Sequence, residues 1–175
     1  YGVNLFFVLS GFLITYLLLK ELRERGKIHI GFFLVRRILR LWPLYFVIVL
    51  FGFFIFPHLP FGTQTLHEFW RYALFLSNFD EIINGSRDSL NFLTATWSVS
   101  IEEQFYLGWA LVIGLFQWKT IRSFQGFFLL VILSSVLFRI YHVYEPQIIY
   151  YHTLSVISDM AIGGLLATIV FENPS

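Results

Sequence analysis

Long apolar stretches with almost no charged side chains run through this sequence. Val3–Leu19 contains no acidic or basic residue, and His152–Phe171 contains only the carboxylate of Asp159. A helix that crosses about 30 Å of hydrocarbon needs roughly 20 such residues, with about 17 as a lower limit. Because lipid offers the backbone no hydrogen bonds, such segments must satisfy their N–H and C=O groups internally, as helices do. The sequence therefore predicts an all-α fold, a polytopic transmembrane helix bundle.

The overall composition excludes a soluble globular protein. Of the 175 residues, 57% are hydrophobic and only 13% are charged, whereas soluble domains average about 25% charged residues. There is no cysteine, which excludes disulfides and thiolate metal sites. The histidines show no metal-ligand spacing such as H-x-x-x-H, so we expect no metal site and place them in loops and at span ends. The formal net charge of +1 gives no reason to expect a nucleic-acid partner.

Five stretches qualify as clear spans, and a sixth is ambiguous. Leu66–Phe79 is only 14 residues long and contains Glu68 and Arg71, so it can lie in the interface, dip into the membrane or span it at a tilt. We predict one membrane-embedded domain over residues 1–175 with five to six spans. The clear spans are Val3–Leu19, Ile38–Phe56, Trp97–Phe116, Gly126–Tyr141 and His152–Phe171.

Both ends of the chain are expected to be cut from a longer protein. The first residue is Tyr1 rather than methionine, and apolar spans lie almost directly against both ends. No basic segment typical of a signal peptide precedes the first span. We therefore expect further helices of the same protein on either side of this chain.

The basic residues divide unevenly between the two sides of the predicted membrane. Nine fall on one side, and three fall on the other, namely Arg71, Arg87 and Arg139. The positive-inside rule places the larger set in the cytoplasm and the segment Pro57–Thr96 outside. The larger set is Lys20, Arg23, Arg25, Lys27, Arg36, Arg37, Arg40, Lys119 and Arg122.

Three arginines enter the second span together, in the string RRILRLWPLYF. Arg36 and Arg40 share a helix face, and Arg37 lies one turn from Arg40. Guanidinium groups suit bidentate recognition of phosphate or carboxylate, so this patch is a candidate for holding an anionic ligand. The alternative is an anchor whose side chains contact lipid headgroups at the inner surface.

Two adjacent glutamates lie within the apolar stretch TWSVSIEEQFYL. Carboxylates are costly in lipid and by default mark a functional site, here at Glu102 and Glu103. The alternative is a capping box, in which Ser100 is the N-cap and Glu103 the third helical residue. The residues alone leave both interpretations open.

Small and polar residues recur in the first and last spans. A helix or a ligand can approach the backbone closely at Asn4, Ser10 and Gly11. Helix packing explains these positions without a function, and it does the same for Gly163–Gly164. Asp159 should face protein or water rather than lipid, either bonded to a neighbouring helix or acting on a ligand.

The strings GVNLFFVLSGFLIT, RRILRLWPLYF and TWSVSIEEQFYL, in this order and spacing, resemble acyltransferase family 3 of integral membrane O-acyltransferases. The later string HTLSVISDMAIGGLLA resembles a further helix of that family, so the resemblance covers nearly the whole chain. It implies that the chain is the middle of a larger bundle in a membrane, in bacteria the inner membrane. Such proteins move an acyl group, usually acetyl from acetyl-CoA, onto hydroxyls of carbohydrates and cell-envelope glycans.

The resemblance also implies roles for individual residues. The family's RxxR motif falls on Arg37 and Arg40, and its acidic motif ends at Glu102. Its proposed catalytic histidine lies in the span before GVNLFF, so this chain is expected to be inactive by itself. Some relatives carry an arginine where this chain has Ile157, so no role of that arginine is carried over. The expected site residues are Glu102 and Glu103 as catalytic groups, Arg36, Arg37 and Arg40 at the acyl donor, and Asn4, Ser10, Gly11, Trp97, Ser98 and Asp159 around the pocket.

The sequence thus predicts part of a membrane O-acyltransferase with acyl-CoA as co-substrate and a carbohydrate or glycan as acceptor. No permanently bound cofactor is expected. A transporter or exporter of a polar ligand is the alternative from another class, because buried carboxylates can also bind cargo. A purely structural membrane protein ranks third, because it has no use for such carboxylates.

Overall fold

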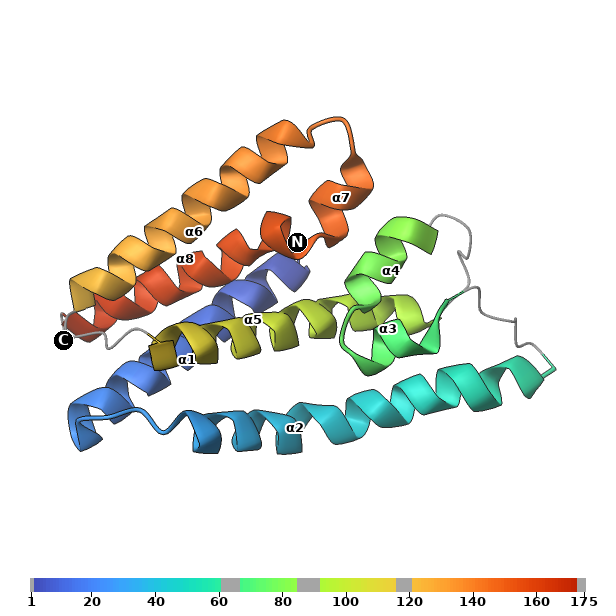
Figure 1. The fold of residues 1–175 in the computed structure, drawn as a ribbon, viewed down its shortest axis with the longest axis horizontal. Helices are drawn as coiled ribbons and strands as arrows, with labels where there is room; N and C mark the ends of the chain where they lie inside the picture. Colours follow the sequence, from blue (N-terminus) through green and yellow to red (C-terminus); the bar gives the residue numbers. More distant parts are fainter. Residues whose placement is uncertain (1, 61–66, 85–91, 116–120, 173–175) are drawn as a thin grey trace. The chain divides into compact units, whose positions relative to one another are not determined.

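The computed structural model describes residues 2–60, 67–84, 92–115 and 121–172. Within these ranges every regular element is a helix (Figure 1), which confirms the predicted all-α class. The chain forms two compact units, each with its own packed interior. Unit 1 comprises Tyr1–Ile30 and Gly108–Ser175, and unit 2 comprises Gly31–Leu107.

Four helical segments are long and apolar enough to cross a membrane, and they confirm four of the predicted spans. Their mean hydropathies lie between 1.8 and 2.2. The first is α1, and the second is α2 together with the π-helix η1 (Phe51–Ile55) and the 3-10 helix η2 (Phe56–His58) that continue it. The third is α6, and the fourth joins α7 to α8. These helices are α1 (Gly2–Arg25), α2 (Ile30–Leu50), α6 (Ile121–Tyr141), α7 (Pro146–Tyr151) and α8 (Thr153–Glu172).

The fifth predicted span is α5, Thr96–Leu115, a helix of 20 residues preceded by the 3-10 turn η3 (Phe92–Ala95). It is not among the four apolar segments, because the three polar residues Glu102–Gln104 lower its hydropathy. That α5 crosses the membrane stays a prediction.

The ambiguous stretch does not form a spanning helix. Its described part folds into α3 (Phe69–Ala73) and α4 (Ser77–Asn84), both far shorter than a span requires. Between them the backbone turns at Phe75, whose φ of 55° is uncommon for a residue with a side chain. The ring of Phe75 stacks on Tyr45 with 4.4 Å between ring centroids, and this packing holds the turn in place.

In unit 1, α8 packs against both α1 and α6 (Figure 1). The contact with α1 brings the two backbones together, because a Cβ at Gly11 would meet the backbone of Met160 and one at Gly163 would meet that of Val8. A Cβ at Gly164 would meet the ring of Phe128 in α6. Helix packing therefore accounts for these glycines, as small residues at membrane helix contacts generally do.

Helix α2, which except for its first residue belongs to unit 2, begins at Ile30 rather than near the predicted Ile38, so Pro43 lies in the helix interior. A cluster of buried side chains joins α2 to α3, to the turn after α3 and to η3. Tyr45 donates a hydrogen bond from its hydroxyl to the backbone carbonyl of Tyr72 over 2.8 Å. The cluster comprises Tyr45, Val49, Tyr72, Phe75 and Leu93.

Candidate functional site

The three candidate arginines of α2 have different surroundings. Arg36 and Arg40 are exposed, whereas Arg37 is half-buried. The guanidinium carbon of Arg37 lies 5.1 Å from the ring centroid of Tyr106 in α5 and 5.9 Å from that of Phe33. Arg37 is therefore the arginine of the patch that the structure places against α5.

The two candidate glutamates are both buried, with 2% of Glu102 and 3% of Glu103 exposed. Glu102 accepts a hydrogen bond from the Tyr106 hydroxyl, with 2.5 Å between the two oxygens. Glu103 accepts one from the indole N–H of Trp42, with 3.1 Å between nitrogen and oxygen. Successive residues differ by about 100° around a helix, yet both carboxylates are enclosed by protein.

The capping-box interpretation of these glutamates is wrong. The helix begins at Thr96, one turn earlier than a cap at Ser100 requires, so Ser100 lies within it. The Ser100 hydroxyl pairs instead with that of Ser77 in α4, at 2.7 Å. A capping role therefore does not explain why two carboxylates are buried here.

One oxygen of Glu103 stands out within the described part of the chain. Oε2 accepts the bond from Trp42, whereas Oε1 is buried and has no hydrogen-bond partner. A buried polar atom without a partner is rare and calls for an explanation such as a ligand. A hydrogen-bond donor from a ligand fits this oxygen.

Polar side chains dock α4 and the turn before it onto α5. The amide nitrogen of Gln104 donates to the Phe75 carbonyl over 2.6 Å and to the Asn78 side chain over 2.8 Å. Thr96 donates to the Ser77 hydroxyl over 3.2 Å. The segment around α3 and α4 is thereby fixed to the helix that carries the two glutamates.

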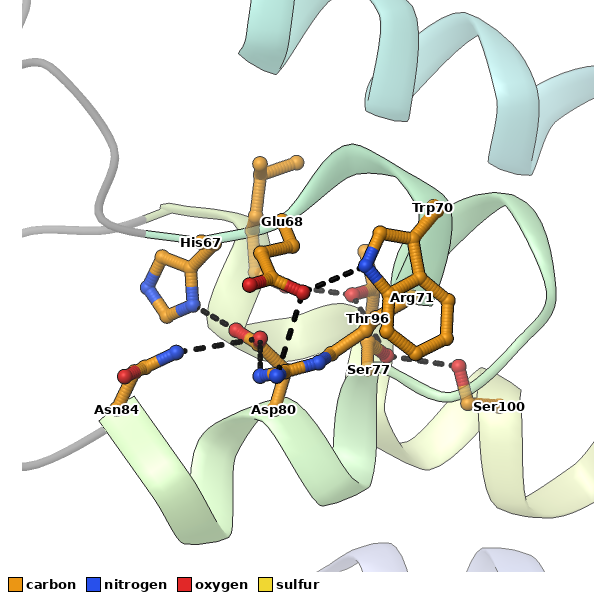
Figure 2. A network of polar contacts seen from close by, with 10 residues as sticks. His67, Glu68, Trp70, Arg71, Ser77, Asp80, Asn84, Thr96 and Ser100 are labelled. Carbon is orange, nitrogen blue, oxygen red and sulfur yellow. Dashed lines mark hydrogen bonds and ion pairs between the residues drawn. The ribbon is translucent and has the colours of Figure 1, made fainter.

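A second polar cluster lies beside the first, within unit 2 (Figure 2). Nδ1 of His67 is hydrogen-bonded to the carboxylate of Asp80, and Arg71 donates to the same carboxylate over 2.6 Å. The side chains of His67 and Asp80 are completely buried. Burial alone would raise the pKa of Asp80, but the hydrogen bonds and charges of His67 and Arg71 outweigh it and hold that pKa below its ordinary value.

Sequence reasoning missed this cluster because it judged each histidine by itself. The predicted loop placement of His67 is confirmed, since it precedes α3, but its burial against Asp80 was not predicted. The available signal was weak: His67 and Arg71 are four residues apart, with an acidic residue further along the same segment. Only the turn between α3 and α4 brings Asp80 back to them.

Unit 1 holds the remaining predicted residues except those at the start of α5. The amide nitrogen of Asn4 donates to Asp159 over 2.6 Å and links α1 to α8, as one of the two interpretations of Asp159 expected. Ser10 is half-buried, and Gly11 lies against the α8 backbone. The structure therefore places Asn4, Gly11 and Asp159 together at the contact between α1 and α8.

Arg139, which the sequence did not single out, forms a similar link between α6 and α8. Its guanidinium is hydrogen-bonded to the hydroxyls of Ser158 and Ser135. Ser158 directly follows Ile157, the position noted above at which some relatives carry an arginine. Arginine in a membrane helix is costly and is usually turned towards protein, as it is here.

At the start of α5, the two residues of the acidic motif have different environments. Trp97 is buried, with 7% exposed. The Ser98 hydroxyl bonds only locally, to the Ala95 carbonyl one turn back at 3.2 Å. Among the residues that the structure describes, no group of three histidine, cysteine or acidic side chains is placed to hold a metal ion.

The site in unit 2 therefore joins a cation, an aromatic ring and buried carboxylates across α2 and α5. A guanidinium can bind an anionic ligand, and a carboxylate can orient or accept the proton of a hydroxyl. Such a pair suits the transfer of a group from a charged donor to a hydroxyl.

Comparison with known proteins gives a consistent result. The model of a family described as "Acyltransferase domain" matches residues 1–175. The chain is 34% identical to "Putative peptidoglycan O-acetyltransferase YrhL" of Bacillus subtilis, an alignment that covers 96% of this chain and 28% of that protein. It is 31% identical to "Peptidoglycan O-acetyltransferase OatA" of Listeria monocytogenes, with 95% and 29% covered. It is 30% identical to "O-acetyltransferase OatA" of Staphylococcus aureus, with 96% and 30% covered.

The chain thus spans less than a third of the length of each of these relatives. No solved structure matches it significantly.

Proposed function

The chain belongs to the acyltransferase domain family, and on this premise we propose that it is part of a bacterial membrane O-acetyltransferase that modifies hydroxyls of a cell-wall glycan. The names of the relatives support both the acetyl group and the peptidoglycan acceptor. Its four long apolar helices make it a multi-pass integral membrane protein. Because the chain covers under a third of those relatives, the activity is proposed for the longer protein that contains it.

The observation that carries the proposal is the contact series Arg37, Tyr106, Glu102, in which Tyr106 and Glu102 are buried and Arg37 is half-buried. A cation from α2 and a carboxylate from α5 meet the same aromatic side chain, and the carboxylate is almost completely enclosed. Burying charges is costly unless they gain partners or serve a ligand. Helix packing would be better served by apolar residues at these positions.

In the proposed reaction the donor is acetyl-CoA. The oxygen of the acceptor hydroxyl attacks the acetyl carbonyl carbon, a C–O ester bond forms, and the C–S bond breaks. The hydroxyl proton passes to a base, and the coenzyme leaves as its thiol. By the family resemblance, that base is a histidine outside this chain.

Residues of this chain bind and orient the two substrates. Arg37 and Arg40, with Arg36 beside them, hold the phosphates of the donor, for which guanidinium groups are well suited. Glu102 orients the acceptor hydroxyl or the histidine that receives its proton. Glu103, whose Oε1 has no partner among the described residues, accepts a hydrogen bond from the bound acceptor.

The transporter alternative gains no support from the comparisons, because all three relatives are named O-acetyltransferases. No contact in the described residues favours it separately.

The experiment is acetyl transfer by the full-length protein in liposomes, with labelled acetyl-CoA and peptidoglycan fragments. We expect labelled ester on the fragments, its loss in Arg37→Gln, and its retention in Arg122→Gln. Arg122 is an exposed arginine of α6 outside the proposed site and serves as the matched control. No ester from the wild-type protein on any glycan would refute the proposal.

A further inference from the structure

Tyr106 touches two of the proposed functional residues with two different parts of its side chain. Its hydroxyl lies 2.5 Å from Oε1 of Glu102, and its ring lies under the guanidinium of Arg37 at 5.1 Å. Only 2% of the residue is exposed, so it is held within the unit rather than at its surface. Tyr106 was not among the predicted site residues.

The ring contact orients Arg37 in a particular way. A guanidinium over an aromatic face is attracted by the ring's quadrupole. That attraction does not use its N–H groups, which remain available for the bidentate bonds that phosphate recognition needs. A carboxylate in place of the ring would compete with an anionic ligand for the same N–H groups. The aromatic face therefore holds Arg37 without competing with its ligand.

The hydroxyl contact orients Glu102. Tyr106 and Glu102 are four residues apart on α5, so they lie on one face of the same helix. The Tyr106 hydroxyl donates to one carboxylate oxygen, and this fixes the direction of the other. Because both residues belong to one helix, the contact persists if α5 moves during the reaction.

We infer that Tyr106 is a positioning residue of the acetyl-transfer site, whose hydroxyl sets Glu102 and whose ring sets Arg37. This inference rests on the proposed function. It assigns the two parts of one side chain to the two substrates: the hydroxyl to the acceptor side and the ring to the donor side. Substitutions that remove one part at a time separate the two roles.

The test uses the full-length protein in liposomes with the variants Tyr106→Phe and Tyr106→Leu. Tyr106→Phe keeps the ring and removes the hydroxyl, so kcat should fall about tenfold or more while the KM for acetyl-CoA stays within about twofold. Tyr106→Leu removes both the ring and the hydroxyl. Its kcat should therefore fall by the same factor as in Tyr106→Phe, and its KM for acetyl-CoA should rise about fivefold. Rates are expressed per amount of folded protein.

Tyr45→Phe is the matched control, because it also removes a buried tyrosine hydroxyl of unit 2, here one bonded to a backbone carbonyl. It should leave both constants of the folded protein unchanged. The double variant Tyr106→Phe/Glu102→Gln provides a second test. If the hydroxyl acts through Glu102, the double variant should be no slower than Glu102→Gln alone.

Three results would overturn the inference: an unchanged kcat in Tyr106→Phe, an equal fall in Tyr45→Phe, or losses that multiply in the double variant. Acetyl-CoA binding to the purified protein separates this inference from the proposed function. Weaker binding in Tyr106→Leu than in Tyr106→Phe supports the donor-side role of the ring even if no acceptor is found. Equal binding by the two variants contradicts it.

Discussion

The indole N–H of Trp42 in α2 donates a hydrogen bond to Oε2 of Glu103 in α5, with 3.1 Å between the two atoms. Trp42 also packs edge-on against Phe46 and near Phe75, so the donor is held by the aromatic cluster around it. The carboxylate of Glu103 is therefore fixed by a side chain of the helix that carries the arginines.

Trp42→Phe should lower the free energy of unfolding by about 1–3 kcal/mol, because it leaves a buried carboxylate oxygen unpaired. Replacing both partners, as in Trp42→Phe/Glu103→Met, should recover most of that loss. Unfolding of the purified protein in mixed detergent micelles measures both. A double variant less stable than Trp42→Phe would show that the hydrogen bond is not the source of the loss.

Arg37→Lys should raise the KM for acetyl-CoA by about tenfold or more, because an ammonium cannot rebuild a bidentate contact that contributes about 1.5–3 kcal/mol. Arg40→Lys should also raise the KM for acetyl-CoA, but by a smaller factor, because Arg40 is exposed and it is Arg37 that contacts the ring of Tyr106. Steady-state kinetics of the full-length enzyme measures both, with Arg122→Lys as control. Changes under about threefold in both variants would favour a lipid anchor.

Asp80→Asn should destabilise the protein at neutral pH and not in strong acid. The folded protein holds the pKa of Asp80 below its ordinary value, through His67 and Arg71. A carboxyl with a depressed pKa adds stability above its unfolded pKa of about 3.9 and loses it as the pH falls through the folded pKa. The gap in melting temperature between wild type and variant should therefore close below about pH 4.

Glu145→Gln is the matched control for this pH dependence. Glu145 also pairs with a histidine, His142, at 2.8 Å, but its side chain is 55% exposed. An exposed pair contributes little to stability, so its melting temperature should match wild type at both pH values. A gap for Asp80→Asn that did not change with pH would contradict the ion-pair explanation.

Lys20–Arg40 should face the cytoplasm and Pro57–Thr96 the outside, because nine of the twelve basic residues fall on one side. These 175 residues contain no cysteine, so each single cysteine is the one thiol within them, and the protein without it measures the background. An impermeant thiol reagent on intact cells should label His58→Cys and spare Lys27→Cys. Both positions are exposed. Equal labelling would show that the assigned orientation is wrong.

Periodicity and hydropathy were enough to predict the helical bundle and four of its spans. The start of α5 was located to within one residue, whereas its predicted end at Phe116 lies outside the described residues, and the polar residues Glu102–Gln104 leave its crossing untested. The stretch around α3 and α4 could not be assigned, because its fold depends on the turn at Phe75, which tertiary stacking on Tyr45 holds. The local conformational preferences of the residues do not predict such a tertiary contact.

The sequence predicted the charged residues of the candidate site, but it did not predict the side-chain contacts that join them. Charged residues in apolar stretches are costly, so Arg37 and Glu102 were visible in the sequence. Tyr106 was hidden because an aromatic residue in an apolar helix is ordinary. Asp80 and His67 were hidden because they lie thirteen residues apart and meet only across the turn between α3 and α4.

The most direct test of a catalytic carboxylate on α5 is acetyl transfer per amount of folded full-length protein, measured side by side for Glu102→Gln and Glu103→Gln. We expect Glu102→Gln to lower transfer at least about a hundredfold, to a small but measurable rate, while the protein stays in the membrane at normal levels. Glu103→Gln should lose about tenfold or less, because the glutamine oxygen can still accept the hydrogen bond from Trp42 and only the bond that Oε1 accepts from the acceptor is lost. Near wild-type transfer by Glu102→Gln would contradict the account.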